Sequence, residues 1–203
     1  MRTVNRAQGA GFTLVEAAVV VAIMGILLAV GMPPMSKWLL ARKAAASAVF
    51  YQDGFAFARN QAIARNAASR LVLIENAANG QMDWRVDVCL PNLSTPCDDG
   101  HGTWSTTATA VAGFTSVQRS AAAMPGEGEI AQSFTPSGAT EVYFNALGWV
   151  NGNVTPRLTR IGIAPAPNRA NAFRPLAVAV TLGGIASVCD PAAAAHATRG
   201  CPP

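Results

Sequence analysis

The stretch Gly11-Phe12-Thr13-Leu14-Val15-Glu16 lies near the start of the chain, and an uncharged apolar run follows it from Ala17 to Met35. The run approaches the roughly 20 residues that an α-helix needs to cross the hydrocarbon core of a membrane. We therefore predict a membrane helix over residues 12–35. A carboxylate inside such a helix costs on the order of 2.5–3.5 kcal/mol, so Glu16 is expected to need a cationic partner.

The residues before this stretch form a short basic segment. Arg2 and Arg6 occur there without an acid, a charge pattern that keeps an N-terminal flank in the cytoplasm. A conventional secretory signal would end its apolar core at a cleavage site between small residues, whereas here the apolar core follows Gly11. The sequence thus predicts a leader at 1–11, a membrane helix at 12–35 and an exported domain at 36–203.

Composition favours one anchored globular domain. Charged residues make up 13% of the 203 residues and hydrophobic residues 51%, which excludes a disordered tail and a protein with many membrane spans. The net charge of +4 is unevenly distributed. Residues 75–141 hold eight acids against two arginines, and residues 145–203 hold five arginines against Asp190 alone.

A second helical length is predicted from Ser36 to about Asn66. Pro33 and Pro34 precede it, and because a proline inside a helix removes a backbone hydrogen bond, we expect a kink or local melting there. The alternative is that one helix stops and another starts. One apolar stripe of the second length is expected to face a sheet. Its residues are Leu39, Ala46, Phe50, Phe57 and Ala64.

After Asn66 the pattern changes to short apolar or alternating runs separated by glycine and proline. Asn79-Gly80 predicts a turn that joins the first two runs into a hairpin. A long helix followed only by strands predicts an α+β fold, with the C-terminal half of the helix packed across an antiparallel sheet. The predicted strands are 70–75, 84–88, 115–119, 130–134, 141–144, 158–163 and 175–181. Strand order within 100–140 is not predicted.

The sequence shows no catalytic signature of the His-Glu-x-x-His, Gly-x-Ser-x-Gly or Gly-Lys-Ser/Thr type. Gly126-Glu127-Gly128-Glu129 lacks the strand and helix that flank a phosphate-binding loop. Asp98-Asp99-Gly100-His101 is more typical of a solvated acidic turn than of a metal site. We expect no enzyme activity, metal, cofactor or small-molecule substrate.

The hexapeptide at 11–16, with its basic leader and apolar run, resembles the type III signal of the type IV pilin superfamily. The resemblance implies that prepilin peptidase cuts between Gly11 and Phe12 and methylates the new amine of Phe12. In that family the glutamate at the position of Glu16 is thought to meet the N-terminal amine of a neighbouring subunit. We therefore expect Glu16 to drive docking into a filament. The alternative, an ordinary single-span anchor, gives no reason for a carboxylate here.

Within the superfamily, the chain most resembles the FimT, FimU and GspH group of minor subunits. The resemblance lies in Ala58-Arg59-Asn60-Gln61-Ala62-Ile63-Ala64-Arg65-Asn66 and Tyr143-Phe144-Asn145-Ala146-Leu147-Gly148. It implies a minor pilin at or near the tip of a type IV pilus, or alternatively minor pseudopilin H of a type II secretion system. The implied partners are other pilin or pseudopilin subunits and prepilin peptidase. The implied location is the bacterial inner membrane, with the domain in the periplasm, and then the pilus or pseudopilus.

All four cysteines follow the predicted membrane segment, which places them in an oxidising compartment where disulfides persist. Their spacing does not match a zinc site. Three connectivities are possible. We favour Cys89 with Cys97 and Cys189 with Cys201, the second of which would tie down the C-terminal loop as in many pilins.

The C-terminal arginines give an alternative function. They could converge on one surface and bind the phosphates of double-stranded DNA, and members of the FimT branch are implicated in DNA uptake through a Gly-Arg-x-Arg motif. This chain has only Thr198-Arg199-Gly200 in the corresponding loop. The other interpretation is scattered charges or contacts to other subunits. The candidate DNA-binding residues are Arg157, Arg160, Arg169, Arg174 and Arg199.

Overall fold

The computed structural model describes residues 12–90, 96–98, 100–194 and 197–202, apart from the side chains of 30–34. The predicted leader at 1–11, with Gly11, lies outside the described residues. The chain divides into two compact units, Met1–Trp38 and Leu39–Pro203.

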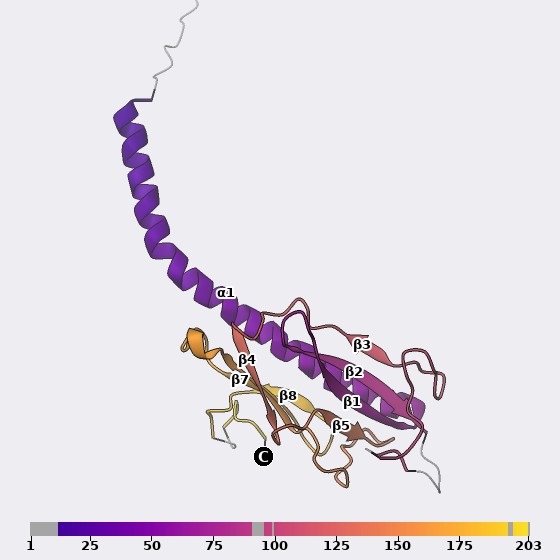
Figure 1. Ribbon diagram of the computed structural model, residues 1–203. Helices are drawn as coiled ribbons and strands as arrows, with labels where there is room; N and C mark the ends of the chain where they lie inside the picture. Colours follow the sequence, from indigo (N-terminus) through magenta and orange to yellow (C-terminus); the bar gives the residue numbers. More distant parts are fainter. Residues whose placement is uncertain (1–11, 91–95, 99, 195–196, 203) are drawn as a thin grey trace, which may run out of the picture. The chain divides into compact units, whose positions relative to one another are not determined.

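Helix α1 runs from Leu14 to Arg65 without a break (Figure 1). The alternative in which one helix stops at Pro33 and Pro34 and another starts is therefore wrong. The side chains of these prolines lie outside the described residues, and the expected kink stays a prediction. Among the residues that the structure describes, no helix is both long enough and apolar enough to cross a membrane.

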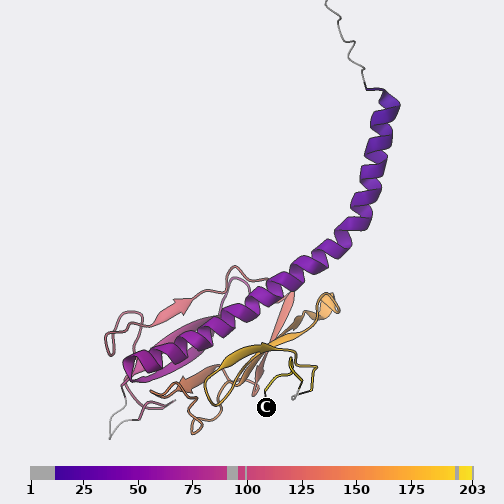
Figure 2. The same cartoon turned by 180° about the vertical axis from the view of Figure 1, so that it is seen from behind.

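The Leu39–Pro203 unit contains two four-stranded antiparallel sheets (Figures 1 and 2). The first has the order β3-β2-β1-β5, and its strands in chain order are β1 (Ala68–Glu75), β2 (Met82–Cys89), β3 (Val117–Arg119) and β5 (Glu141–Phe144). The second has the order β4-β6-β7-β8, with strands β4 (Ile130–Thr135), β6 (Arg160–Pro165), β7 (Leu176–Val180) and β8 (Ala186–Cys189). A short 3-10 helix, η1 (Pro167–Arg169), follows β6.

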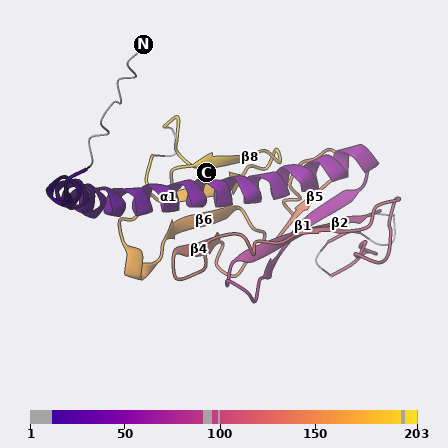
Figure 3. The ribbon, with the colours of Figure 1, turned by 90° about the horizontal axis from the view of Figure 1, so that it is seen from above.

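The α+β class, with a long helix on antiparallel strands, is confirmed. Every predicted strand overlaps an observed one, but they form two sheets where one was expected, and β8 was not predicted. Figure 3 shows the C-terminal half of α1 lying across both sheets. One apolar core joins this part of the helix to both of them.

The predicted contact stripe on α1 is right for Phe50 and Phe57, which pack against the core at its edge, and wrong for its other three residues. Leu39, Ala46 and Ala64 are exposed, and Phe50 and Phe57 are only partly buried. Small residues instead dominate the buried stripe, because alanine lets a helix backbone approach a sheet closely and leaves the bulkier rings at the edges of the contact. The two phenylalanine rings lie 5.8 and 5.9 Å from the Trp84 ring. The buried stripe is Leu40, Ala44, Ala48, Tyr51, Phe55, Ala58 and Ala62.

Tyr51 connects α1 to both sheets. Its hydroxyl donates to the Met82 carbonyl in β2 (2.7 Å) and accepts from Gln132 Nε2 in β4 (2.6 Å). Burial raises the pKa of Tyr51 to about 12. A buried phenol with both hydrogen bonds made fixes the position of the helix over the junction of the two sheets.

The segment 58–66, which carries the resemblance to the FimT, FimU and GspH group, ends the helix. Asn66 adopts a left-handed conformation with φ 47°, and the N–H of Ala67 returns to the Ala62 carbonyl at 3.1 Å. This is the geometry of a Schellman C-cap, in which asparagine is a common substitute for glycine.

The two arginines of this segment hold loops against the helix. Arg59 Nε donates to the Gly148 carbonyl (3.2 Å), and Arg65 Nη1 donates to the Ala112 carbonyl (2.9 Å). Arg65 also lies 4.8 Å from the centre of the Phe114 ring. The two arginines of the segment 58–66 therefore have a structural role in this chain, which is to hold two loops against α1.

An ion-pair network occupies the face of the first sheet that points away from α1. Asp87 is completely buried and accepts hydrogen bonds from Arg70 Nε (3.0 Å) and Arg85 Nε (2.8 Å). Arg70 and Asp87 are direct partners in the β1–β2 register. The Arg70 guanidinium lies 4.5 Å from the centre of the Trp104 ring, so the loop after β2 covers the network.

Asp83 is a second buried acid, and it fixes the loop between β3 and β4. Its carboxylate accepts hydrogen bonds from the Ala121 N–H and Asn76 Nδ2, both at 2.7 Å, and from Gln118 Nε2 at 3.3 Å. Burial alone would raise the pKa of Asp83, but these donors outweigh it and hold the pKa below its ordinary value. Folding thus favours the ionised form.

The lowered pKa of Asp83 predicts that the folded domain loses stability in acid. A carboxyl whose pKa is lower in the folded state contributes its full stabilisation above its unfolded pKa of about 3.9, and loses it as pH falls through the folded value. We expect the free energy of unfolding to fall as pH drops below about 4, and to fall less in Asp83→Asn. Urea unfolding from pH 6 to pH 3 measures both. Parallel pH profiles for the two proteins would contradict the assignment.

Candidate functional site

Glu16, the predicted assembly residue, lies in the first turn of α1. Thr13 Oγ1 accepts a hydrogen bond from the Glu16 N–H at 3.2 Å, and the Thr13 carbonyl accepts from the Ala17 N–H at 3.2 Å. Thr13 is thus the N-cap, and Glu16 stands at the third helical position, the pattern of a capping box. An acid there is also favoured by the helix dipole.

Glu16 is exposed on a helix surface that is otherwise apolar. Phe12 is 79% exposed and Leu14 85% exposed, and among the described residues none forms an ion pair with Glu16. Such a surface needs a cover of lipid or protein. The other exposed large apolar side chains between Phe12 and Leu28 are Val15, Val19, Val20, Val21, Ile23, Met24, Ile26, Leu27 and Leu28.

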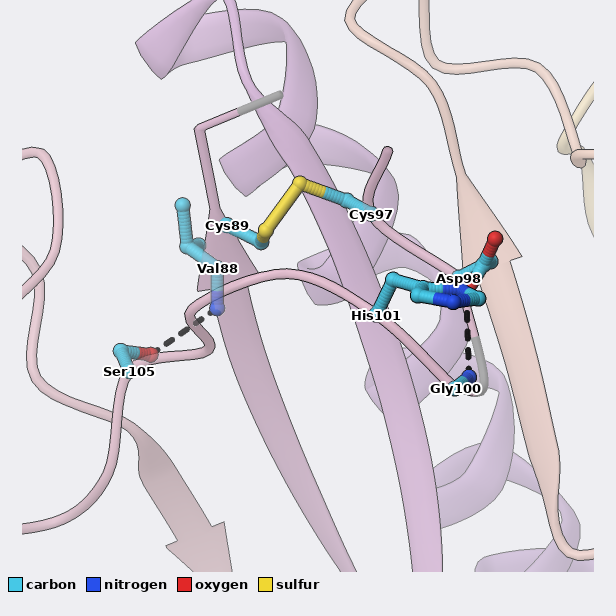
Figure 4. Close-up of a disulfide and its surroundings, with 7 residues drawn as sticks. All are labelled: Val88, Cys89, Cys97, Asp98, Gly100, His101 and Ser105. Carbon is cyan, nitrogen blue, oxygen red and sulfur yellow. Dashed lines mark hydrogen bonds and ion pairs between the residues drawn. A yellow bond between two sulfur atoms is a disulfide. The ribbon is translucent and has the colours of Figure 1, made fainter. Parts of the chain in front are cut away.

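The disulfides pair as the sequence favoured. Cys89 is bonded to Cys97 and Cys189 to Cys201. Figure 4 shows the first of them beside the turn at Asp98. The bridged cysteines are 8 and 12 positions apart in the sequence, and closing segments of that length is worth roughly 2–3 kcal/mol in the chain-entropy account.

The turn at Asp98 contains its own hydrogen bonds. Asp98 Oδ1 accepts from the Gly100 N–H (3.0 Å) and lies 2.9 Å from His101 Nδ1 (Figure 4). The bond to His101 lowers the pKa of Asp98. Within the described residues, which leave out Asp99, no group of three acidic, histidine or cysteine side chains could hold a metal ion.

Two of the candidate DNA-binding arginines form ion pairs with acids. Arg169 Nη2 lies 3.6 Å from Glu129, and Arg174 Nε lies 3.6 Å from Asp190. Arg199 is exposed in the loop before Cys201. These ion pairs offset the positive charges of Arg169 and Arg174. The two arginines therefore do not support a DNA-binding surface, which stays a prediction.

Arg157 and Arg160, by contrast, line one cavity of about 220 Å³. Beside it lies a surface that the sequence reasoning missed, which we call the two-turn surface. It consists of the turns 145–150, after β5, and 181–185, between β7 and β8. Its exposed apolar residues are Leu147, Trp149, Leu182 and Ile185. Large apolar residues inside glycine-containing turns were the signal available in the sequence.

Two glycines allow these turns to pack together. Gly148 and Gly184 both have φ 76°, and a Cβ on Gly184 would collide with the Gly148 carbonyl oxygen. We expect Gly184→Ala to destabilise the domain by about 2 kcal/mol, since a left-handed alanine alone costs about 1–2 kcal/mol. Gly183→Ala is the matched control, because its nearest neighbour would be Thr181 Oγ1 at 3.8 Å. Equal thermal or urea stability of the two variants would show this packing to be unimportant.

The comparison with protein families supports the sequence reasoning at the N-terminus. The family described as the prokaryotic N-terminal methylation motif matches residues 6–32. Comparisons with curated proteins and with solved structures gave no match. The matched segment contains the leader arginine Arg6, the predicted cleavage position and Glu16. The chain therefore carries a prokaryotic N-terminal methylation motif at residues 6–32.

Proposed function

We propose that this chain is a prepilin-like precursor that becomes a structural subunit of a type IV pilus. Prepilin peptidase cuts it between Gly11 and Phe12 and methylates the Phe12 amine. The observation that carries the proposal is a methylation motif leading into the exposed apolar N-terminal part of α1, whose first turn holds Glu16.

The helix needs two successive environments in this proposal. Its apolar side chains are first covered by the lipid of the inner membrane and then by the helices of neighbouring subunits, with the domain on the periplasmic side. A carboxylate in either environment is costly unless it is paired. The amine that cleavage creates at Phe12 is a cation near the same end of the helix, and a neighbour's amine can pair with Glu16.

We further propose a minor subunit at or near the pilus tip, on the resemblance of 58–66 and 143–148 to the FimT, FimU and GspH group. The same features suit minor pseudopilin H of a type II secretion system. Deletion of the gene separates the two. Loss of surface pili with normal export supports the pilus, and exoproteins retained in the periplasm of a piliated strain support secretion.

The processing step has a direct test. The full chain is produced with and without an active prepilin peptidase, and the mature protein is analysed by N-terminal sequencing and intact mass. We expect a chain that begins at Phe12 and is heavier by one methyl group than the unmodified sequence. A mature chain that begins at Met1, or one cut after residue 35, would refute the proposal.

A further inference from the structure

Arg157 contains a buried donor with nothing to bind. Its Nε is inaccessible to solvent and has no hydrogen-bond partner among the described residues, while Nη1 makes one long bond of 3.4 Å to the Gly152 carbonyl. A buried donor left unpaired costs about 1–3 kcal/mol, and more for a charged group. The guanidinium of Arg157 therefore keeps hydrogen-bonding capacity that no described residue uses.

The surroundings of Arg157 suit an anion. Arg160 and Thr159 line the same cavity, and within the described residues no carboxylate forms an ion pair with either arginine. Guanidinium groups bind carboxylates and phosphates through charge-assisted and often bidentate hydrogen bonds. The cavity of about 220 Å³ is large enough for one such group.

An apolar cavity adjoins the cationic one. It measures about 460 Å³ and is lined by Trp149, Val150, Gly152, Leu182 and Gly183. Val150 and Leu182 line both cavities. An anionic group and a large apolar group can therefore be received side by side, on either side of the same two residues.

The backbone around the two cavities is held in place. The Val150 N–H donates to the Leu182 carbonyl at 2.9 Å, and Gln52 Nε2 of α1 donates to the Ala186 carbonyl at 3.2 Å. Binding to a preorganised surface loses little conformational entropy.

We propose that the two cavities together bind a protein segment in which a large apolar side chain stands next to a carboxylate. The apolar side chain enters the cavity at Trp149, and the carboxylate pairs with Arg157 and Arg160. An apolar cavity beside the cations does not suit the phosphodiester backbone of a nucleic acid, and the phosphatidylglycerol vesicles in the test below separate a lipid surface from a protein segment. Two copies facing each other through this surface would oppose arginine with arginine. The inference does not depend on N-terminal processing.

The test uses the full chain in neutral phosphatidylcholine nanodiscs, labelled with fluorotryptophan. Trp149→Phe identifies the Trp149 resonance, and the probe is the peptide Gly-Phe-Glu-Gly, capped at both ends. We expect a saturable shift of that resonance. Affinity should fall at least about tenfold for Gly-Phe-Gln-Gly, for Gly-Ala-Glu-Gly and for Arg157→Gln. Arg174→Gln is the matched control, since Arg174 pairs with Asp190, and it should bind as the unchanged chain does.

Three outcomes would overturn the proposal. The first is no shift at millimolar peptide, and the second is equal binding of the glutamate and glutamine peptides by the unchanged chain, a comparison that involves no variant protein. The third is a shift that depends on Arg157 and is produced instead by phosphatidylglycerol vesicles or by a short DNA duplex, either of which would identify a different class of partner.

Discussion

A chain with Glu16→Gln is expected to reach the membrane, lose its leader and gain its methyl group, and yet to be absent from sheared filaments. The reason is electrostatic. Inside a filament the amine of a neighbour's Phe12 would be left without a counter-charge, and an unpaired charge in apolar surroundings costs several kcal/mol. Immunoblots of the membrane and filament fractions, together with intact mass, measure each step separately.

Thr13→Ala distinguishes this role from a capping role. Glu16 stands at the third position of a helix capped by Thr13, and glutamine serves there as well as glutamate does. Glu16→Gln therefore removes the charge and keeps the cap, whereas Thr13→Ala loses about 1 kcal/mol of capping and keeps the charge. We expect Thr13→Ala to enter filaments. Normal incorporation of Glu16→Gln, or equal failure of both variants, would contradict the pairing.

Asp87→Asn is expected to destabilise the domain by about 3 kcal/mol, although Arg70 would keep Glu141 at 3.8 Å. The substitution keeps the shape of the side chain and removes the only acid hydrogen-bonded to both Arg70 and Arg85 among the described residues. Breaking a buried pair by removing one partner costs about 3–5 kcal/mol, because the other charge stays behind. We expect a loss toward the lower end of this range, because Arg85 is partly exposed and water can solvate its charge.

Urea unfolding followed by tryptophan fluorescence measures this loss, because Trp104 packs on Arg70. Asp98→Asn is the matched control, since that acid is paired with an exposed histidine at 2.9 Å and solvent-exposed pairs contribute little to stability. A difference between the two variants below about 0.5 kcal/mol would show that the network contributes little.

The elements of the fold could be predicted from the sequence, because helix length, strand alternation and turn residues are local signals. The buried face of α1 and the division of the strands into two sheets depend on packing, and they could not be predicted from the sequence. The predicted stripe was chosen because it contains Phe50 and Phe57. The face that packs on the sheets is instead rich in alanine, because small residues allow close approach. Its alanines are Ala44, Ala48, Ala58 and Ala62. β8 has the sequence Ala-Ser-Val-Cys, in which only Val188 is a strongly strand-favouring residue, so its local signal is weak.

The same holds for the candidate sites: those made of contiguous residues could be predicted, and those assembled from distant residues could not. The methylation motif is contiguous, so the sequence alone was enough to identify it. The Asp87 network depends on the β1–β2 register that sets Arg70 beside Asp87. The cavity at Arg157 depends on contact between turns that are more than 30 residues apart in the sequence, and the five arginines gave no indication of which ones would have acids nearby.

The two-turn surface has a consequence for protein engineering. Its backbone is held by carbonyl contacts from Arg59 and Val150, while Leu147 and Ile185 point their side chains to solvent. Residues at these two positions can therefore be exchanged at little thermodynamic expense, provided that Gly148 and Gly184 are kept. Substitutions at these two positions, in contrast to insertions that would open the hydrogen-bonded turns, allow the surface to be re-shaped for affinity-reagent design without disturbing the turn packing.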